Sequence, residues 1–585
     1  MNFPVKTMLA ALMLALMSVA CSPDPQAVSE EGGADLILIN GRVYTLDWGE
    51  PGPDGTPAAD APREESGWRP DAEAVATKGG EILFVGRTRE AMAFQGDATR
   101  VVDLAGATVI PGLVDSHTHV YGLGAKLDSI DLTDVATEEE AVALVAEKAE
   151  TTPAGEWIIG RGWDEGAWAN RYPDKVLLSE AAPNNPVFLD SLHGFAVWVN
   201  QAALDAGGIT AETEVPVGGE MRLGDDGEPN GLFLNRATTM IDDIVPPPAM
   251  ETRLNRWLMG LNQMAEDGYV AIHEAGLNTE AMAALEQLEA EGRLPIRVYA
   301  MLSLRDEPLI RKWIEKGPDK DNDSMLVTRA VKAYYDGALG SRGARMLYDY
   351  EDMPGHRGVS GDGYGFDQAL NAEAMKAGFQ VAIHAIGDAG NRESIDILES
   401  VFEQDPSTRA NRHRIEHAQV IHPDDIPRLG QLGIIASMEP PHAMEDKTWA
   451  EKRLGPERIL GAYAWRSLRE SGAALTFNSD NPGSDHDIFY GLHSAITRQD
   501  KNLQPEGGWY PEQRMSSDEA LRGYTSWSAY ASFREDDTGI IEAGRWADLT
   551  VIDIDPFVLA EESPSDILNG RVLMTIVNGE VVYER

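Results

Sequence analysis

The stretch Val109-Ile-Pro-Gly-Leu-Val-Asp-Ser-His-Thr-His119 is an apolar run that ends in two histidines separated by one residue. In a β-strand, residues i and i+2 lie on the same face, so His117 and His119 can bind one cation from the end of a single strand. A lone His-x-His pair also arises by chance in loops. The interpretation as a metal site therefore depends on further ligands elsewhere in the chain.

Four further ligand-type residues each follow or end a strand-like run: Lys332, His384, His417 and Asp480. A repeated order of strand, functional residue and loop is typical of a (β/α)8 barrel, whose functional side chains lie at the carboxyl ends of the strands. About 30 residues separate His384 from His417 and about 60 separate His417 from Asp480, which matches one and two strand–helix units. If the histidine pair ends strand 1, the four residues fall on strands 4, 5, 6 and 8.

The distance along the chain from His119 to Lys332 indicates an insertion. It is about 210 residues, whereas three strand–helix units need about 90. We therefore expect an inserted subdomain of about a hundred residues after strand 1, near residues 121–255, that covers the strand ends where the chemistry would occur.

Both ends of the chain contain short strand-like runs. Residues 35–46 read as two strands about an Asn-Gly turn, and residues 81–86, 547–553 and 573–583 have the same character. The expected fold class is α/β, with a TIM-like (β/α)8 barrel over residues 109–535 and a small β-sandwich built from residues 35–108 and 536–585.

The first twenty residues have the features of a signal peptide. Lys6 is basic, residues 8–17 form a short apolar run, and residues 18–20 offer small side chains for cleavage. The apolar run is too short to span a bilayer as a helix. The only cysteine, Cys21, follows directly, as in bacterial lipoproteins, although ordinary cleavage beside an incidental cysteine is the alternative. We expect an exported periplasmic or cell-surface lipoprotein, with residues 21–34 as a tether.

Composition limits the classes of partner. A chain of 585 residues with 43% hydrophobic side chains can bury a large core and more than one domain. The formal net charge of −47 argues against nucleic-acid binding, because a phosphate backbone would be repelled. With one cysteine, no disulfide can form within the chain. The expected partners are a small-molecule substrate and, only through the lipid anchor, a membrane; a homodimer is compatible with the sequence.

The sequence contains His-x-His, a lysine, two histidines and an aspartate in that order. In this arrangement it resembles the metal-dependent amidohydrolase superfamily. The finer resemblance is to amidohydrolase family 3, the N-substituted formamide deformylase-like branch. It covers nearly everything after residue 35, and five stretches carry it: 160–165, 191–204, 333–344, 384–391 and 478–482. These stretches are specific for fold and metal chemistry and poorly specific for substrate.

The ligand types suit zinc, although iron, manganese and nickel also bind imidazole and carboxylate. Lys332 is the exception, because an ammonium group repels a cation. Burial near metal should lower its pKa, and the free amine could add carbon dioxide to form a carbamate that bridges two metals. The resemblance implies this carboxylated lysine. An ion-paired lysine beside a single metal is the alternative.

We expect two divalent metal ions, with one on His117, His119 and Asp480, the other on His384 and His417, and carboxylated Lys332 on both. The metals would lower the pKa of a shared water, so that hydroxide attacks a polarised carbonyl, and Asp480 would be the general base that returns the proton to the leaving amine. The bond cleaved would be an amide, N-formyl or cyclic-imide C–N bond. The alternatives are a single-metal deaminase of a heterocyclic amine, which does not need the lysine, and a non-enzymatic protein on an enzyme scaffold, against which the intact ligand set argues.

Five further residues are weaker candidates. His193, in the insert, matches a family histidine and is a candidate catalytic residue that hydrogen-bonds the substrate carbonyl; a structural histidine is the alternative. Asp336 and Asp388 follow ligand strands and either contact substrate, orient a histidine or cap a turn. His442 follows strand 7 and is a candidate for the pocket wall. Trp163 lies among aromatic residues of the insert, which in a lid would favour an apolar or aromatic substrate.

Overall fold

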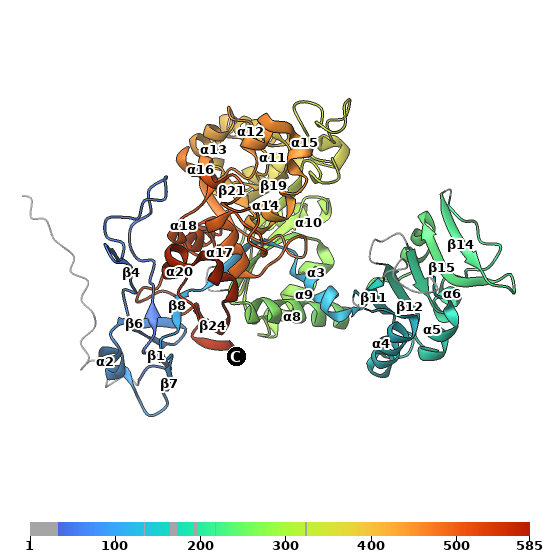
Figure 1. Ribbon diagram of the computed structural model, residues 1–585, viewed down its shortest axis with the longest axis horizontal. Helices are drawn as coiled ribbons and strands as arrows, with labels where there is room; N and C mark the ends of the chain where they lie inside the picture. Colours follow the sequence, from blue (N-terminus) through green and yellow to red (C-terminus); the bar gives the residue numbers. More distant parts are fainter. Residues whose placement is uncertain (1–32, 134, 164–171, 192–195, 217, 322–323) are drawn as a thin grey trace, which may run out of the picture.

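The computed structural model describes residues 33–133, 135–163, 172–191, 196–216, 218–321 and 324–585. The predicted signal peptide, Cys21 and His193 lie outside the described residues. Figure 1 shows three parts along the long axis, namely a β-domain at one end, a central barrel and an insert at the other end. Within the described ranges, no helix combines the length and the apolar character that a membrane crossing requires.

Eight parallel strands form a nearly closed barrel and follow one another in sequence order. They are β9 (Leu113–Thr118), β16 (Tyr269–Leu277), β17 (Arg297–Ser303), β18 (Leu326–Tyr334), β19 (Gln380–Ala385), β20 (Arg414–His417), β21 (Ile435–Met438) and β22 (Ala474–Phe477). At the seam between β9 and β22, Ser116 Oγ donates to the carbonyl oxygen of Phe477 over 2.8 Å, and the backbone N–H of Asp480 donates to the His117 carbonyl over 2.9 Å. The predicted TIM-like barrel is confirmed.

The ligand-type residues occupy the strands that their spacing predicts. Lys332 lies on β18, His384 on β19 and His417 at the end of β20, which are the fourth, fifth and sixth strands. Asp480 follows β22, the eighth strand. Because the strands are parallel, these residues meet the histidine pair of β9 at one end of the barrel.

Helices connect the strands and cover the outside of the barrel (Figure 1). They are α3 (Val120–Asp128), α8 (Met250–Glu266), α9 (Thr279–Ala290), α10 (Glu307–Lys316), α11 (Gln368–Lys376), α12 (Asp388–Gln404), α13 (Ile426–Leu432), α14 (Pro440–Asp446), α15 (Ala450–Arg458), α16 (Trp465–Glu470), α17 (Ile488–Thr497), α18 (Ser517–Gly523) and α19 (Ser526–Ala531). Several begin at side chains that accept backbone N–H groups, such as Asp306 at α10, Asp367 at α11 and Ser516 at α18. These caps fix where the helices start.

Two sheets built from both ends of the chain pack face to face beside the barrel, as the β-sandwich prediction requires. One has the order β6 (Glu81–Gly86), β5 (Ala74–Lys78), β1 (Leu36–Ile39) and β7 (Arg100–Asp103); the other has the order β2 (Arg42–Val43), β8 (Thr108–Pro111), β23 (Leu549–Ile552), β24 (Val572–Val577) and β25 (Glu580–Glu584). The strands either side of the Asn40-Gly41 turn lie in different sheets. They therefore do not pair with each other, and the turn carries the chain from one sheet to the other.

The opening stretch of the sequence does not form one strand. Val109 and Ile110 belong to β8 of the terminal sheet, whereas Leu113 begins β9 of the barrel. Gly112 separates the two strands, and a Cβ atom there would lie 2.4 Å from Val270 Cγ2. A larger residue does not fit at this crossing, and the barrel begins at Leu113 rather than at residue 109.

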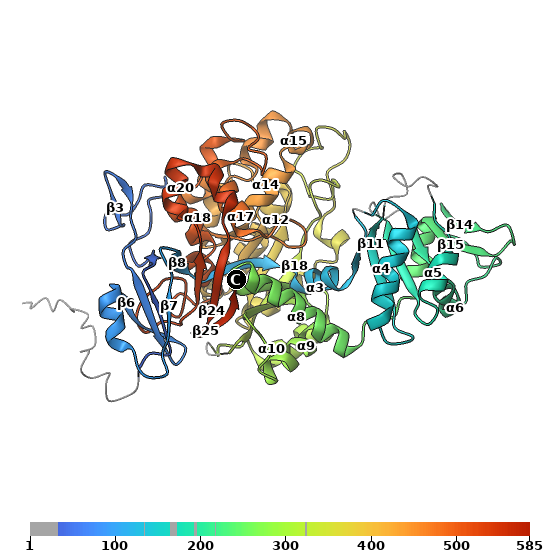
Figure 2. The ribbon, with the colours of Figure 1, turned by 60° about the horizontal axis from the view of Figure 1, so that its bottom comes forward.

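The insert has a sheet and a hydrophobic core of its own. Its elements are β10 (Ile130–Asp131), β11 (Ile158–Trp163), β12 (Val187–Ser191), β13 (Ala196–Val199), β14 (Gly219–Leu223), β15 (Pro229–Asn235), α4 (Glu138–Thr151), α5 (Lys175–Ala181), α6 (Gln201–Gly207) and α7 (Thr239–Asp242). At its base, Asp128 at the end of α3 pairs with Lys148 of α4 and Arg256 of α8, each at 3.0 Å. Figures 1 and 2 both show the insert standing beside the barrel on α3 and α8, so its described residues do not form the expected cover over the strand ends.

Candidate metal centre

Four of the predicted ligands lie in direct contact at the carboxyl end of the barrel. The Nε2 atoms of His119 and His117 lie 3.3 and 3.5 Å from Asp480 Oδ1, and ligand atoms of these three residues all lie within 4.8 Å of one another. Lys332 Nζ lies 2.9 Å from His117 Nε2. His117 and Lys332 are buried, whereas His119 and Asp480 are partly exposed, so the group can be reached from one side.

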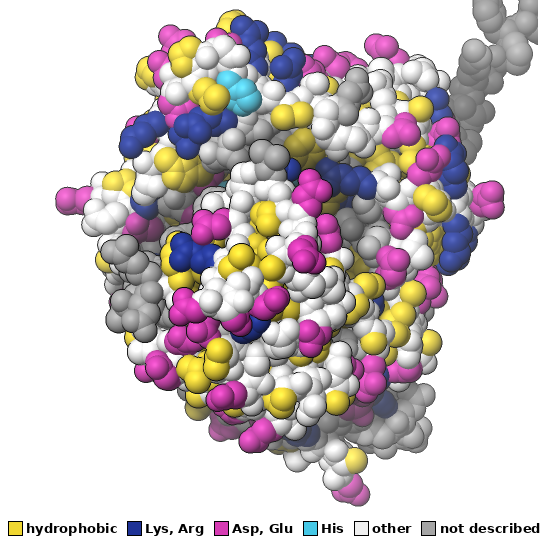
Figure 3. All heavy atoms as spheres, turned by 90° about the vertical axis from the view of Figure 1, so that its right-hand side faces the viewer, with side chains coloured by type: hydrophobic (Ala, Val, Ile, Leu, Met, Phe, Trp, Pro, Cys, Tyr) yellow, Lys and Arg dark blue, Asp and Glu magenta, His cyan; other side chains and the backbone are white. Residues whose placement is uncertain are grey.

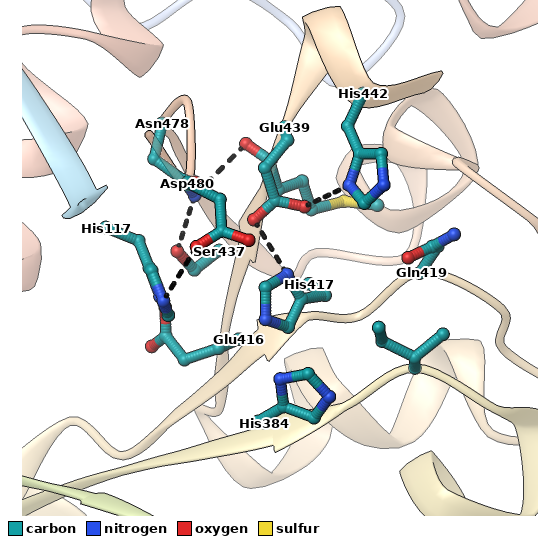
Figure 4. Close-up of polar contacts among 12 residues, drawn as sticks. His117, His384, Glu416, His417, Gln419, Ser437, Glu439, His442, Asn478 and Asp480 are labelled. Atoms are coloured by element: carbon teal, nitrogen blue, oxygen red, sulfur yellow. Dashed lines mark hydrogen bonds and ion pairs between the residues drawn. The ribbon is translucent and has the colours of Figure 1, made fainter. Parts of the chain in front are cut away.

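The two remaining predicted ligands complete the group. The ring centroids of His384 and His417 lie 4.4 Å apart, and that of His417 lies 5.2 Å from His117. Figure 4 shows His117, His384, His417 and Asp480 pointing toward a common space. The structure therefore brings together all six residues that the sequence singled out.

A buried nitrogen without a partner tests whether these residues fit a metal. His384 Nε2 is buried and has no hydrogen-bond partner among the described residues, and Asp336 Oδ1 is 3.7 Å away. Leaving such an atom unpaired is costly, and coordination to a cation would satisfy it. Imidazole nitrogens with one carboxylate are a donor set that suits a divalent ion such as Zn²⁺.

The surroundings set the protonation of Lys332 and Asp480. Burial lowers the pKa of Lys332 to about 8, despite the opposing charges of Glu416 and Asp480. A fraction of this lysine is therefore neutral amine near neutral pH, the form that can add carbon dioxide. Burial alone would raise the pKa of Asp480, but the hydrogen bond from His119 and the nearby imidazoles hold it well below its usual value. Asp480 is accordingly an ionised carboxylate.

Glu416 is a site residue that the sequence analysis missed. Its Oε2 lies 2.5 Å from His117 Nδ1, and its Oε1 accepts a 2.7 Å hydrogen bond from Arg414 Nε. All three side chains are fully buried. A carboxylate on Nδ1 turns the Nε2 lone pair of the imidazole toward a metal. The signal was the Arg-x-Glu alternation just before His417, which places two charges on one face of a buried strand.

Replacing Glu416 with glutamine is expected to weaken metal affinity by about 10- to 100-fold, because the orienting charge on His117 is lost. It should also lower the free energy of unfolding by about 3–5 kcal/mol, since Arg414 stays buried without a charged partner. Chelator competition measures the first effect and denaturant titration the second. Glu399→Gln, which breaks a surface pair with Arg428, is the control. It should change neither the metal affinity nor the free energy of unfolding by much. Equal metal affinity in wild type and Glu416→Gln would contradict the orienting role.

A second buried carboxylate, that of Glu439, lies beside the predicted ligand His417. Its Oε1 lies 3.2 Å from His417 Nδ1, and its Oε2 lies 3.8 Å from Nδ1 of His442. His442 Nε2 lies 3.3 Å from Asp446 Oδ2. Burial lowers the pKa of His442, but the two carboxylates outweigh it and raise the pKa to about 9. His442 is therefore a cation near neutral pH. Glu439 lies between it and the predicted ligand His417 (Figure 4).

The pH dependence of stability should report this ion pair. A folded-state pKa of about 9 for His442 exceeds the unfolded value of about 6.5, so its stabilisation is complete below pH 6.5 and is lost as pH rises through 9. We expect the free energy of unfolding of the wild type to exceed that of His442→Gln by about 3 kcal/mol at pH 6. This difference should shrink toward zero above pH 9. Denaturant titrations across this range measure it. A difference that does not change with pH would rule out the charged histidine.

The two weaker aspartate candidates, Asp336 and Asp388, brace loops, and substrate contact by either stays a prediction. Asp336 is fully buried, and its carboxylate accepts three backbone N–H groups, those of Arg345, Ile386 and Gly387, at 2.8–2.9 Å. Asp388 is also buried and accepts the N–H of Leu347 over 2.8 Å. The alternative of turn and helix capping, which the sequence left open, describes both residues.

The aromatic candidate of the insert is a core residue. Trp163 is fully buried, and its Nε1 donates to the carbonyl of Leu189 over 2.9 Å. Its ring packs edge-on against Trp198, 6.2 Å away. Among the described residues Trp163 therefore belongs to the core of the insert, and its role in substrate binding stays a prediction. His193 lies outside the described residues.

Two cavities open near the carboxyl end of the barrel. One of about 240 Å³ has the ligand His119 in its wall. A larger one of about 520 Å³ is lined by Asp388 and by loops that follow the fourth to seventh strands, and none of the six ligands lines it. Because a substrate must reach the ligands, the smaller cavity is the better candidate for the substrate pocket.

Comparison with known proteins agrees with this arrangement. The model of the amidohydrolase family matches residues 100–583. The chain belongs to the amidohydrolase family. The resemblance to amidohydrolase family 3 is thereby confirmed, and with it the coarser functional statement that the protein is a hydrolase of a generally metal-dependent family.

Individual relatives match over nearly their whole length. The chain is 29% identical to Protein LONG AFTER FAR-RED 3 of Arabidopsis thaliana, over 94% of this chain and 92% of the relative. It is 28% identical to N-substituted formamide deformylase of Arthrobacter pascens, over 94% of this chain and 98% of the relative. The crystal structure of an uncharacterized metal-dependent hydrolase from Pyrococcus furiosus superposes with a TM-score of 0.70 at 26% identity, covering 89% of this chain and 99% of that one.

Proposed function

We propose that the protein is a two-metal hydrolase that cleaves a non-peptide C–N bond in an amide, an N-formyl compound or a cyclic imide. The observation that carries the proposal is the position of Lys332, buried inside the ligand group with its Nζ 2.9 Å from His117 Nε2. A single-metal site has no use for a lysine there, whereas a carboxylated lysine bridges two metals. The similarity to an N-substituted formamide deformylase supports the class of bond.

His117, His119 and Asp480 would hold one ion, His384 and His417 would hold the other, and carboxylated Lys332 would contribute to both. When bound, the ions supply a water of lowered pKa and polarise the carbonyl of the substrate. The donor set favours Zn²⁺. Glu416 is hydrogen-bonded to Nδ1 of His117, which directs its Nε2 toward the ions, and Glu439 lies 3.2 Å from Nδ1 of His417 as a charged neighbour.

Asp480 moves the proton in the proposed reaction. Its ionised Oδ1 lies at the open side of the group, beside His119 Nε2. It accepts a proton from the water as the oxygen bonds to the carbonyl carbon, and donates that proton to the departing nitrogen as the C–N bond breaks. An amide or N-formyl substrate gives a carboxylic acid, ionised at neutral pH, and an amine, whereas a cyclic imide opens to a single molecule that carries a carboxylate and an amide.

Metal counting tests this proposal directly. Elemental analysis of protein loaded with Zn²⁺ should give two equivalents per chain, and a screen of N-formyl amines, other amides and cyclic imides should show metal-dependent turnover. A stoichiometry that never exceeds one equivalent, together with ammonia release from aminopyrimidines, would replace the proposal with the single-metal deaminase.

A further inference from the structure

The 240 Å³ cavity beside the metal centre lies between α3, α8 and the end of β16. His119 stands at its metal side, and Tyr121, with Trp257 packed behind it, forms an apolar wall. The rings of Tyr121 and Trp257 lie 5.5 Å apart, and Trp257 is fully buried. A fixed aromatic wall of this kind suits a flat or bulky apolar group.

Arg253 adds a positive charge to this cavity. Its Nε donates to the carbonyl of Pro248 over 3.0 Å, which anchors the side chain. Within the part of the chain that the structure describes, no carboxylate oxygen lies within 4.0 Å of the Arg253 guanidinium. Arg256, on the same helix, is instead paired with Asp128 at 3.0 Å.

The one carboxyl group in the cavity wall is engaged elsewhere. Glu274 Oε2 accepts the backbone N–H of Val120 over 2.8 Å and so caps the first turn of α3. It is buried, and it makes no ion pair with Arg253. The terminal nitrogens of Arg253 therefore remain available to a ligand in the cavity.

The rest of the protein makes this charge distinctive. The chain carries a net charge of −47, and acidic side chains are spread over the face in Figure 3. An acidic surface repels an anionic ligand. The guanidinium of Arg253, which has no carboxylate partner among the described residues, attracts such a ligand at this one position beside the metal centre. Guanidinium groups bind carboxylates through paired N–H donors, which gives direction as well as charge.

We propose that this cavity is a subsite for a substituent with an apolar body and a carboxylate, so that the substrates are N-acylated amino acids bearing a large apolar side chain. Arg253 binds the carboxylate, and the side chain packs against the ring of Tyr121, which Trp257 holds in place from behind. This inference rests on the proposed function, which it narrows from C–N bonds in general to anionic amides.

A matched pair of substrates tests the charge. N-formylphenylalanine, in both enantiomers, and N-(2-phenylethyl)formamide differ only by the carboxylate. In Arg253→Met, kcat/KM for the preferred enantiomer of N-formylphenylalanine should fall by about 10- to 100-fold, while that for the neutral formamide stays within about twofold. Arg256→Met, which removes the same charge one turn along α8, is the control and should leave the ratio between the two substrates unchanged. Arg253→Lys should restore part of the loss.

A binding measurement separates this inference from the proposed reaction. Calorimetry on the metal-loaded protein with 3-phenylpropionate and 3-phenylpropan-1-ol should show tighter binding of the acid, and Arg253→Met should abolish the preference. Acid binding or acid turnover that is unchanged in Arg253→Met would overturn the subsite. If no formamide is cleaved, the proposed reaction fails, and the calorimetric preference still decides whether Arg253 binds carboxylates.

Discussion

Lys332→Ala is expected to lower hydrolysis by about 10³-fold or more and to release metal under mild chelation, because it removes the residue proposed to bridge the two metals. Lys332 is buried and faces His117 Nε2. A side chain at the protein surface therefore cannot replace it as a ligand. Steady-state kinetics and elemental analysis after dialysis measure the two effects.

A second substitution at the same position sharpens this test. Lys332→Met also removes the amine but keeps most of the side-chain volume. Bicarbonate or a short-chain acid added to the solution should partly restore Lys332→Ala by entering the vacated space, and should not restore Lys332→Met. Two retained metals and near-normal turnover in Lys332→Ala would show that the carbamate model is wrong.

Asp480→Asn is expected to keep much of the metal and to lose about 10²- to 10⁴-fold in kcat, the usual range for loss of general acid–base catalysis. Asparagine has a similar shape but cannot accept the proton from water. Because Asp480 lies 3.3 Å from His119 and 3.5 Å from His117, the loss of its charge also weakens one metal position and can enlarge the effect.

The same loop offers a control for this substitution. Asp485 pairs with Lys501 at the surface and is not a ligand, so Asp485→Asn should leave kcat and metal content unchanged. Near-wild-type kcat in Asp480→Asn would exclude Asp480 as the proton carrier. A full loss in Asp480→Asn with normal turnover in Lys332→Ala would favour the single-metal alternative.

The barrel and its ligand group could be predicted because they follow local rules. A strand that ends in a chemically distinctive residue repeats along the chain, and the spacings from His384 to His417 and from His417 to Asp480 match one and two strand–helix units. Parallel strands then place their carboxyl ends together whatever the loops contain. Nothing beyond the sequence was needed to find these residues.

What the sequence could not provide were contacts made across the fold. Glu416 meets His117 only after six strands have assembled, and the break at Gly112 depends on the side chain of Val270 in another strand. The position of the insert depends on how α3 and α8 pack, which no pattern within the insert encodes. The place of Trp163 in the core of the insert was not predictable for a related reason, since aromatic composition does not distinguish a subdomain's own core from a surface that faces substrate.

The seam between β9 and β22 has a consequence for how the protein is made. The first and last strands of the barrel supply His117 and Asp480, and the strand before the seam, β8, pairs with β23 near the carboxyl end. A growing chain therefore cannot assemble the His117, His119 and Asp480 group until almost all of it has been synthesised. Any partial chain released before that point has His117 and His119 without Asp480, so a metal ion that needs all three residues could bind only late in synthesis.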